Sequence, residues 1–234
     1  MYSFDSKIRY SEVDSKGVLT FHSLLNYYQD VCSFHAEDAG VGIEYIREKE
    51  LLWVLCAWQV EVEAMPKLGD QVTIGTIPYD FKGCMGNRNF FLQDAEGKML
   101  SKANSVWMLL DTKTLKPTKM PEGMMERYNP SPKLEMDYAP RKIDLPDTFE
   151  TKEIVEIKKY HLDTNQHVNN GRYIDMALEY LPDGFKVKGM RAEYKNQAYL
   201  GDRIEPKISY LEDRFVVVLQ KEGGEICCIV EFTK

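Results

Sequence analysis

The feature that most constrains the fold of this sequence is an internal repeat. A stretch with helical spacing of apolar residues is followed by a series of short alternating segments, and this order occurs in residues 20–110 and again after residue 163. Short alternating segments joined by turns are typical of antiparallel strands, and one helix per series can pack against their apolar face. The sequence therefore predicts an α+β protein of two similar modules, each a curved antiparallel sheet wrapped around one helix.

Each of the two predicted helices carries one apolar stripe. The first helix lies between Thr20, which is placed as its N-cap, and Ala39. The second follows a polar loop that ends near Gly171. The stripes consist of Phe21, Leu24, Leu25, Tyr28, Val31 and Cys32 in the first helix and of Tyr173, Ile174, Ala177, Leu178 and Leu181 in the second.

The segments around the helices correspond between the two halves. Asp14 and Asp163 each end a predicted strand just before a helix, and the Leu-Gly-Asp turn at residues 68–70 has its counterpart at residues 200–202. The aspartates are 149 residues apart and the turns 132, so the first half contains an extra segment, expected as a turn at residues 43–49. Further strands are expected at 53–64, 71–77, 85–93 and 99–110 in the first half and at 190–197, 203–210, 214–221 and 225–233 in the second.

A proline-rich stretch separates the modules. Six of the ten prolines lie between Pro117 and Pro146. Proline fixes φ and removes a backbone donor, so this stretch is neither a continuous helix nor a central strand. We predict a first module at residues 1–116, a linker at 117–150 and a second module at 151–234.

Charge and cysteine content exclude several classes of protein. The net charge is -7, whereas nucleic-acid-binding proteins usually carry a basic surplus. The apolar runs are far shorter than the roughly 20 residues of a membrane helix, and no secretion signal opens the sequence. The five cysteines contain no C-x-x-C pair, which favours buried reduced thiols. We expect a cytoplasmic protein with no nucleic-acid partner and no membrane insertion.

The densest polar segment is the loop at residues 161–171. It can be a simple turn with a helix N-cap, or a metal site built from His161, Asp163 and His167. It also suits catalysis. Histidine exchanges protons at neutral pH, a carboxylate such as Asp163 orients its neighbours, and the amide of Asn165 can donate to a developing oxyanion. These groups, placed just before a helix N-terminus, fit the addition of water to a carbonyl or thioester.

The corresponding loop of the first half lacks these groups. When the two halves are aligned so that Asp14 matches Asp163, Lys16 corresponds to Asn165 and Val18 corresponds to His167. Only the second half can therefore carry this chemistry, which leaves the first half to form a wall for an apolar substrate.

Four segments resemble the acyl-acyl-carrier-protein (acyl-ACP) thioesterases of plants and bacteria, over essentially the whole chain. The segment Asp163-Thr-Asn-Gln-His-Val-Asn-Asn170 is similar to the family's catalytic D-x-N-x-H-V-N-N motif. Residues 10–14 resemble its opening motif, residues 83–90 its glycine- and arginine-bearing hairpin, and residues 105–111 its strand leading into the linker. The resemblance implies a tandem double hotdog that hydrolyses fatty acyl-ACP in fatty acid biosynthesis without a metal or redox cofactor.

The resemblance also implies roles for single residues. Asp163 would orient its neighbours, Asn165 would polarise the thioester carbonyl, and His167 would transfer protons. Plant members carry a Glu-Cys pair where this sequence has Gln197 and Ala198. That departure rules out a cysteine nucleophile there and leaves no carboxylate at this position to activate water. Gln197 can still hold a water molecule by hydrogen bonds.

The expected partner, ACP with its acyl chain, is strongly acidic, so docking onto a chain of net charge -7 needs a local basic patch. The alternative is a solvated edge strand defended by lysines. The acyl chain is expected between the helix and sheet of the first module, although each candidate there also suits an ordinary core. The docking candidates are Arg172, Lys186, Lys188 and Arg191, and the substrate-binding candidates are Phe21, Leu25, Tyr28, Trp53 and Arg88.

Two other functions remain open from the sequence. One is hydrolysis of acyl-CoA, which would need recognition of the adenosine phosphate. The other is a non-catalytic acyl-binding hotdog, which the Asp-Asn-His set disfavours and Gln197 favours mildly. The tandem repeat supplies the usual hotdog pairing within one chain, so a monomer and a homodimer are both compatible with the sequence.

Overall fold

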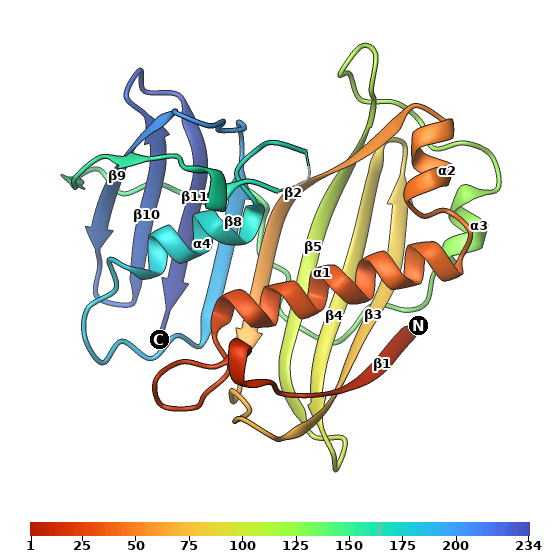
Figure 1. Cartoon of the computed structure of the whole chain (residues 1–234), viewed down its shortest axis with the longest axis horizontal. Helices are drawn as coiled ribbons and strands as arrows, with labels where there is room; N and C mark the ends of the chain where they lie inside the picture. Colours follow the sequence, from red (N-terminus) through yellow and green to blue (C-terminus); the bar gives the residue numbers. More distant parts are fainter. Residues whose placement is uncertain (164) are drawn as a thin grey trace. The chain divides into compact units, whose positions relative to one another are not determined.

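The computed structural model describes residues 1–163 and 165–234, which form two compact units. The first comprises residues 1–56 and 60–138, and the second comprises residues 57–59 and 139–234. The boundary at residue 139 falls inside the segment predicted as the linker. Both units are α+β, with one main helix lying on an antiparallel sheet (Figure 1), as expected for a tandem double hotdog.

The first unit has the sheet order β1-β3-β4-β5-β2, and helix α1 crosses one face of it, in contact with β1 and β3 (Figure 1). Strands β1, β3, β4 and β5 pair antiparallel in this order. Its elements are β1 (Tyr2–Lys7), α1 (Phe21–Asp38), α2 (Ile43–Glu48), β2 (Leu51–Val62), β3 (Gln71–Lys82), β4 (Met85–Asp94), β5 (Met99–Asp111) and α3 (Met124–Tyr128).

Helix α1 confirms the helix predicted from the first apolar stripe. Thr20 is its N-cap, and the side-chain oxygen accepts a hydrogen bond from the Ser23 backbone N–H at 3.1 Å. Leu24, Tyr28 and Val31 on the stripe are completely buried. The extra segment expected at residues 43–49 is the short helix α2.

The second unit has the sheet order β8-β11-β10-β9-β6, with β7 also paired to β9 and α4 packed on β10 and β11. The pairs that β9 forms with β6, β7 and β10, and those that β11 forms with β8 and β10, are antiparallel. Its elements are β6 (Glu150–Thr151), β7 (Val155–Glu156), α4 (Asn170–Leu178), β8 (Gly189–Tyr194), β9 (Arg203–Tyr210), β10 (Arg214–Lys221) and β11 (Ile226–Thr233).

Helix α4 is shorter than its predicted stripe. Asn169 is the N-cap, and its side chain accepts a hydrogen bond from the Gly171 backbone N–H at 2.8 Å. The prediction that Leu181 continues the helix is wrong. The helix ends at Leu178, followed by two tight i→i−3 hydrogen bonds, because Pro182 disfavours helical backbone at the residue before it.

The internal repeat is confirmed by equivalent backbone hydrogen bonds in the two units. The N–H of the N-cap residue donates to the carbonyl eight positions earlier, and the N–H of the residue before the N-cap donates to a carbonyl in the segment that follows β2 in the first unit and β8 in the second. The N–H of the Leu-Gly-Asp glycine donates to the carbonyl of the isoleucine six positions before Asp14 or Asp163. In the first unit these bonds join Thr20 to Glu12, Leu19 to Pro66 and Gly69 to Ile8, and in the second they join Asn169 to His161, Val168 to Ala198 and Gly201 to Ile157.

The prediction that Asp14 and Asp163 each end a strand is wrong. A short 3₁₀ turn separates the strand from the aspartate in each unit. It lies at Tyr10–Glu12, between β1 and Asp14, in the first unit and at Lys159–His161, between β7 and Asp163, in the second. Each turn is closed by a side chain, since the Glu12 carboxylate and the His161 ring each accept from the backbone N–H three residues earlier. A nearby side chain thus accepts the backbone hydrogen bond that a neighbouring strand would accept if the alternating polar and apolar pattern continued as a strand.

Within the part of the chain that the structure describes, the helices are all too short or too polar to cross a bilayer.

Candidate active site

The polar loop after the second 3₁₀ turn forms a tight turn centred on Asp163. The Asp163 backbone N–H donates to the His167 carbonyl at 2.9 Å, and the Gln166 N–H donates to the Asp163 carbonyl at 3.1 Å. Gln166 has a φ of 65°, a left-handed conformation that costs a side-chain-bearing residue free energy. The turn places Asn165 and His167 on either side of a sharp bend.

The Asp163 carboxylate holds this turn closed. Its Oδ1 accepts a hydrogen bond from the Asn165 backbone N–H at 2.8 Å. Asp163 and His167 are half-buried, whereas Asn165 is exposed. The aspartate therefore orients its neighbours through the backbone, and the amide of Asn165 is accessible to a ligand.

His161 is separate from this group. It is buried, and its Nδ1 accepts a hydrogen bond from the Lys158 backbone N–H at 2.9 Å. Burial lowers the pKa of His161, and the nearby positive charges of Arg172 and Lys158 lower that pKa further. His161 is a neutral structural residue of the 3₁₀ turn. Among the described side chains, His, Cys, Asp and Glu form no cluster suited to a metal ion.

Gln197 lies beside the loop because the next residue anchors it. The Val168 backbone N–H donates to the Ala198 carbonyl at 2.9 Å, and the Ala198 N–H donates to the Tyr173 hydroxyl of α4 at 3.0 Å. Ala198 is completely buried, whereas Gln197 is exposed. The backbone thus joins the segment of Gln197 to both the polar loop and the helix that follows it.

Tyr199 is a site residue that the sequence did not indicate. Its ring meets the His167 ring edge-on, with the ring centroids 5.5 Å apart and the planes at 79°. Its hydroxyl donates to Gln197 Oε1 at 3.0 Å. Its exposure of 47% is high for a tyrosine with two such contacts. The available signal was a large aromatic residue directly after Gln197 and Ala198.

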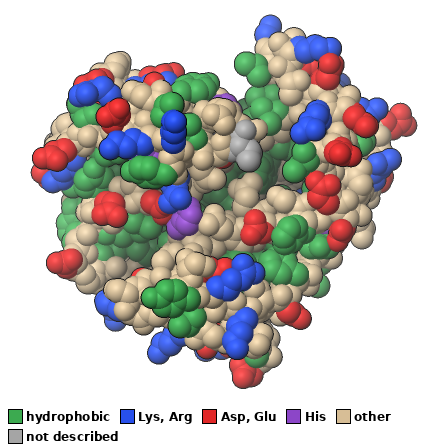
Figure 2. Space-filling model, viewed as in Figure 1, with side chains coloured by type: hydrophobic (Ala, Val, Ile, Leu, Met, Phe, Trp, Pro, Cys, Tyr) green, Lys and Arg blue, Asp and Glu red, His purple; other side chains and the backbone are tan. Residues whose placement is uncertain are grey.

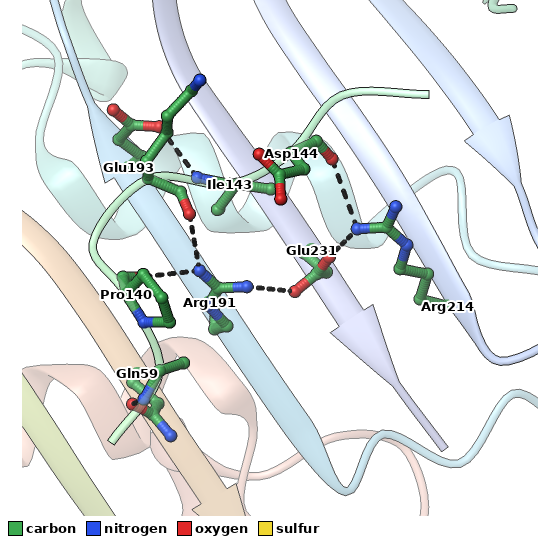
Figure 3. Close-up of polar contacts among 10 residues, drawn as sticks. Gln59, Pro140, Ile143, Asp144, Arg191, Glu193, Arg214 and Glu231 are labelled. Atoms are coloured by element: carbon green, nitrogen blue, oxygen red, sulfur yellow. Dashed lines mark hydrogen bonds and ion pairs between the residues drawn. The ribbon is translucent and has the colours of Figure 1, made fainter. Parts of the chain in front are cut away.

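The four candidate docking residues have different surroundings. Lys186 and Lys188 are exposed on the loop before β8. Arg172 lies on the first turn of α4 and forms an ion pair with Asp175 at 3.0 Å. Arg191 on β8 is engaged within the second unit (Figure 3).

The Arg191 contacts form a cluster that we call the linker clamp, made of Arg191, Glu231 and Arg214. Both guanidinium groups bind the Glu231 carboxylate, which is only 4% exposed. Arg191 also donates to the carbonyls of residues 140 and 142, and Arg214 donates to that of residue 144 (Figure 3). The Arg191 guanidinium is therefore occupied by the chain's own linker segment.

A second contact set holds the same segment. The Ile143 backbone N–H donates to Glu193 Oε2 at 3.2 Å, and Lys195 pairs with the other Glu193 oxygen at 3.0 Å. The Ile143 side chain is 1% exposed and packs on buried residues of β10 and β11, which are Val216, Val218 and Ile229. Residues 140–144 thus lie firmly on the sheet of the second unit.

The candidate substrate-binding residues lie in the first unit, in two groups. Phe21, Leu25 and Tyr28 are buried on the apolar stripe of α1, where Tyr28 contacts Phe90 of β4 with ring centroids 5.2 Å apart. Trp53 of β2 is half-buried and packs near Tyr128 of α3.

Arg88 is buried close to Trp53's cluster. Its Nη1 donates to His35 Nδ1 at 3.0 Å and to Thr76 Oγ1 at 3.2 Å, and its guanidinium lies 5.3 Å from the centre of the Tyr128 ring. Burial and the positive charge of Arg88 lower the pKa of His35 to about 4. The neutral His35 ring therefore accepts the hydrogen bond from Arg88 at neutral pH.

Comparison with known proteins finds curated relatives that are named as acyl carrier protein thioesterases or hydrolases. The chain spans about half the length of the curated relatives it matches. One is the palmitoyl-acyl carrier protein thioesterase, chloroplastic, of Arabidopsis thaliana, which is 30% identical over 81% of this chain and 50% of its own length.

Two solved structures resemble the chain over nearly their whole length. The crystal structure of an acyl-ACP thioesterase from Bacteroides thetaiotaomicron is 25% identical with a TM-score of 0.88, covering 99% of this chain and 96% of its own. The 12:0-ACP thioesterase of Umbellularia californica is 20% identical with a TM-score of 0.83 and the same coverage, which supports the shared fold.

The family models cover almost all of the chain. Residues 1–128 match the acyl-ACP thioesterase N-terminal domain, and residues 133–230 match the acyl-ACP thioesterase C-terminal domain. The motifs that carried the resemblance lie within these two ranges. The chain belongs to the acyl-ACP thioesterase family.

Proposed function

We propose that this protein hydrolyses the thioester of fatty acyl-ACP and releases the fatty acid and ACP. The observation that carries the proposal is the turn at Asp163, which presents Asn165 and His167 next to the segment of Gln197 in a chain whose two halves match this family. The names of the relatives agree with the reaction.

The reaction joins a water oxygen to the thioester carbonyl carbon and then breaks the carbon–sulfur bond. One proton leaves the water as the tetrahedral intermediate forms, and one proton is delivered to the departing thiolate of the carrier's prosthetic arm. His167 is suited to both transfers, because an imidazole can accept a proton and return it at neutral pH. Its half-buried position keeps it accessible to a substrate.

The intermediate carries a negative oxygen that needs hydrogen-bond donors. The exposed amide of Asn165 can donate to it, and the first backbone N–H groups of α4 add the positive end of the helix dipole. A preorganised donor of this kind contributes about 2.7–4 kcal/mol to transition-state stabilisation. Asp163 acts through the turn that it holds closed.

Water activation falls to His167 or Asp163, because Gln197 has no basic oxygen at neutral pH. Gln197 would hold the water, or the thioester oxygen, by its amide. A carboxylate at this position would add a second base, so Gln197→Glu tests whether the histidine alone suffices.

The acyl chain is proposed to lie along the apolar stripe of α1 in the first unit. Phe21, Leu25 and Tyr28 offer buried apolar surface there, and Trp53 offers a half-buried indole near Arg88. Leu25→Trp would then shift the preference of the enzyme to shorter acyl chains. An equal loss of activity on acyl-ACPs of every chain length would contradict this placement.

ACP is proposed to dock on Lys186, Lys188 and Arg172. Arg191 is left out because Glu231 and the linker carbonyls occupy its guanidinium. Basic and acidic side chains are interspersed over the visible face of the protein (Figure 2), and the net charge is -7, so a local patch must attract an acidic carrier. Unchanged kcat/KM for acyl-ACP after Lys186→Glu with Lys188→Glu would contradict the patch.

The decisive experiment measures steady-state hydrolysis of a panel of acyl-ACPs and matching acyl-CoAs. His167→Ala is compared with Val18→Ala, which changes the equivalent position of the first unit. We expect turnover that prefers acyl-ACP, is lost in His167→Ala and is retained in Val18→Ala. Equal rates on acyl-CoA would favour a CoA thioesterase, and binding of acyl chains without turnover would favour an acyl-binding protein.

The biosynthetic role, the cellular location and the oligomeric state of the protein stay predictions. A role in fatty acid biosynthesis follows only if acyl-ACP is the substrate. Cell fractionation tests the cytoplasmic location, and light scattering distinguishes the monomer from the homodimer.

A further inference from the structure

Tyr199 connects two of the residues proposed for catalysis. Its hydroxyl donates to Gln197 Oε1 at 3.0 Å, and its ring lies edge-on to His167 with centroids 5.5 Å apart. It stands on the short segment between β8 and β9, next to the Ala198 carbonyl that accepts from Val168. One side chain thus contacts both the histidine and the glutamine.

The hydrogen bond determines what the Gln197 amide can offer. An amide oxygen can accept two hydrogen bonds and the amide nitrogen can donate two. The Tyr199 hydroxyl binds Oε1, which fixes the rotation of the amide and directs Nε2, the donor group that a water molecule or a thioester oxygen would need, away from the hydroxyl. Without the tyrosine hydroxyl, the exposed amide can rotate and present either atom.

Tyr199 is itself held from two directions. Its backbone N–H donates to Asp202 Oδ2 at 3.0 Å, and the same oxygen forms an ion pair with Lys221 at 3.3 Å. The Lys221 ammonium lies 5.7 Å from the centre of the Tyr199 ring. These contacts give the half-exposed ring a defined position, in which its hydroxyl bonds Gln197 and its ring packs against that of His167.

We propose that Tyr199 is a positioning residue that fixes the donor side of Gln197 and the ring plane of His167. This inference rests on the proposed hydrolysis, because it assigns Tyr199 a role within that same site. The competing explanation is that Tyr199 only packs on the surface, and this makes different predictions for kinetics and spectra.

The kinetic test is a double-mutant cycle with Tyr199→Phe and Gln197→Ala, measured on the best acyl-ACP substrate. Tyr199→Phe keeps the ring and removes the hydroxyl. We expect kcat to fall about 3- to 10-fold, the range for a single hydrogen bond, with KM unchanged. In the Gln197→Ala background, Tyr199→Phe is expected to cause no further loss.

The matched control is Tyr210→Phe. Tyr210 is 53% exposed, lies in the same unit, and its hydroxyl is hydrogen-bonded to Lys234 at 2.7 Å. We expect this variant to keep the wild-type kcat. Equal losses from Tyr199→Phe in the wild-type and Gln197→Ala backgrounds, or a loss confined to KM, would overturn the proposal.

A spectroscopic measurement separates this proposal from the proposed function. Tyr199→Phe is expected to shift the NMR signal of the Gln197 side-chain amide, and Tyr199→Leu is expected also to shift the His167 ring signals by removing the aromatic neighbour. Absence of both shifts would overturn the positioning role. Absence of wild-type turnover with both shifts present would overturn the hydrolysis and leave the positioning intact.

Discussion

Asp14 and Asp163 occupy equivalent positions in the two repeats, and each carboxylate accepts a hydrogen bond at 2.8 Å from the backbone N–H two residues later. Asp14 also accepts from the Val18 N–H at 3.0 Å, and these bonds lower the pKa of its carboxyl. The same turn therefore forms in both units, with the proposed catalytic side chains in the second unit and without them in the first.

The first prediction compares Asp14→Ala with Asp163→Ala. Both variants lose the acceptor that closes the turn, so both are expected to unfold at a slightly lower urea concentration than the wild type. Only Asp163→Ala should lower kcat, by about 100-fold or more, because only its turn carries Asn165 and His167. An equal loss of activity in both variants would show that the aspartate acts through stability alone.

The second prediction concerns His35 and acid. Its pKa of about 4 in the folded protein lies below the ordinary 6.5 of the unfolded chain. The unfolded state thus binds more protons between these values, so the stabilising effect of the neutral ring is complete above pH 6.5 and declines as the pH falls towards 4. The effect is on the order of 1–3 kcal/mol.

This effect is measured by urea unfolding between pH 4.5 and 7.5. His35→Gln, which keeps an acceptor for Arg88, should show a weaker decline towards acid than the wild type. Parallel curves for the two proteins would assign the pH dependence to other groups.

The third prediction concerns the linker clamp. Glu231→Ala removes the buried carboxylate that both Arg191 and Arg214 bind, so two neighbouring positive charges lose their partner. The free energy of unfolding should fall by about 3–5 kcal/mol. The control is Glu222→Ala, which breaks an exposed ion pair with Arg203 and should cost about 0–1 kcal/mol. Similar losses in both variants, measured by urea unfolding, would contradict the role of burial in the clamp.

The fourth prediction concerns Gln166, the left-handed residue of the Asp163 turn. Gln166 has a φ of 65°, whereas the equivalent residue of the first unit is Gly17 with a φ of 73°. Gln166→Gly should stabilise by about 0.5 kcal/mol, since the relief of strain slightly exceeds the entropy cost of glycine.

The reverse change provides its control. A Cβ at Gly17 meets no atom within 4 Å, so Gly17→Ala reports the backbone strain alone and should destabilise by about 1 kcal/mol. If thermal unfolding finds that both changes have the same sign, the strain argument fails.

Local patterns predicted the fold well, and they predicted the turn that holds the candidate site. The stripe and N-cap of α1 depend on neighbours within one helical turn, and the Asp163 turn depends on five successive residues, so both are readable from the sequence. The strands predicted to end at Asp14 and Asp163 were wrong because side chains of Glu12 and His161 close a turn that alternation does not reveal.

The contacts missed from the sequence join distant residues. Arg191 has the appearance of a surface cation in a basic run, but its partner Glu231 lies 40 positions later on the neighbouring strand. The bond between Tyr199 and Gln197 is short-range, yet nothing in an extended pattern shows that one ring also meets His167. Strand pairing decides the first contact, and the backbone hydrogen bond between Val168 and Ala198, which brings the two loops together, decides the second.

The linker clamp also determines how a protease meets the chain. Arg141 and Lys142 are exposed cleavage sites for trypsin in a proline-rich segment, but the carbonyls of Pro140 and Lys142 and the N–H of Ile143 are held by the sheet. Cleavage requires an extended stretch of backbone to leave these partners and enter the protease. Digestion after Arg141 or Lys142 therefore reports the opening of the second unit, rather than the mobility that a surface linker would suggest.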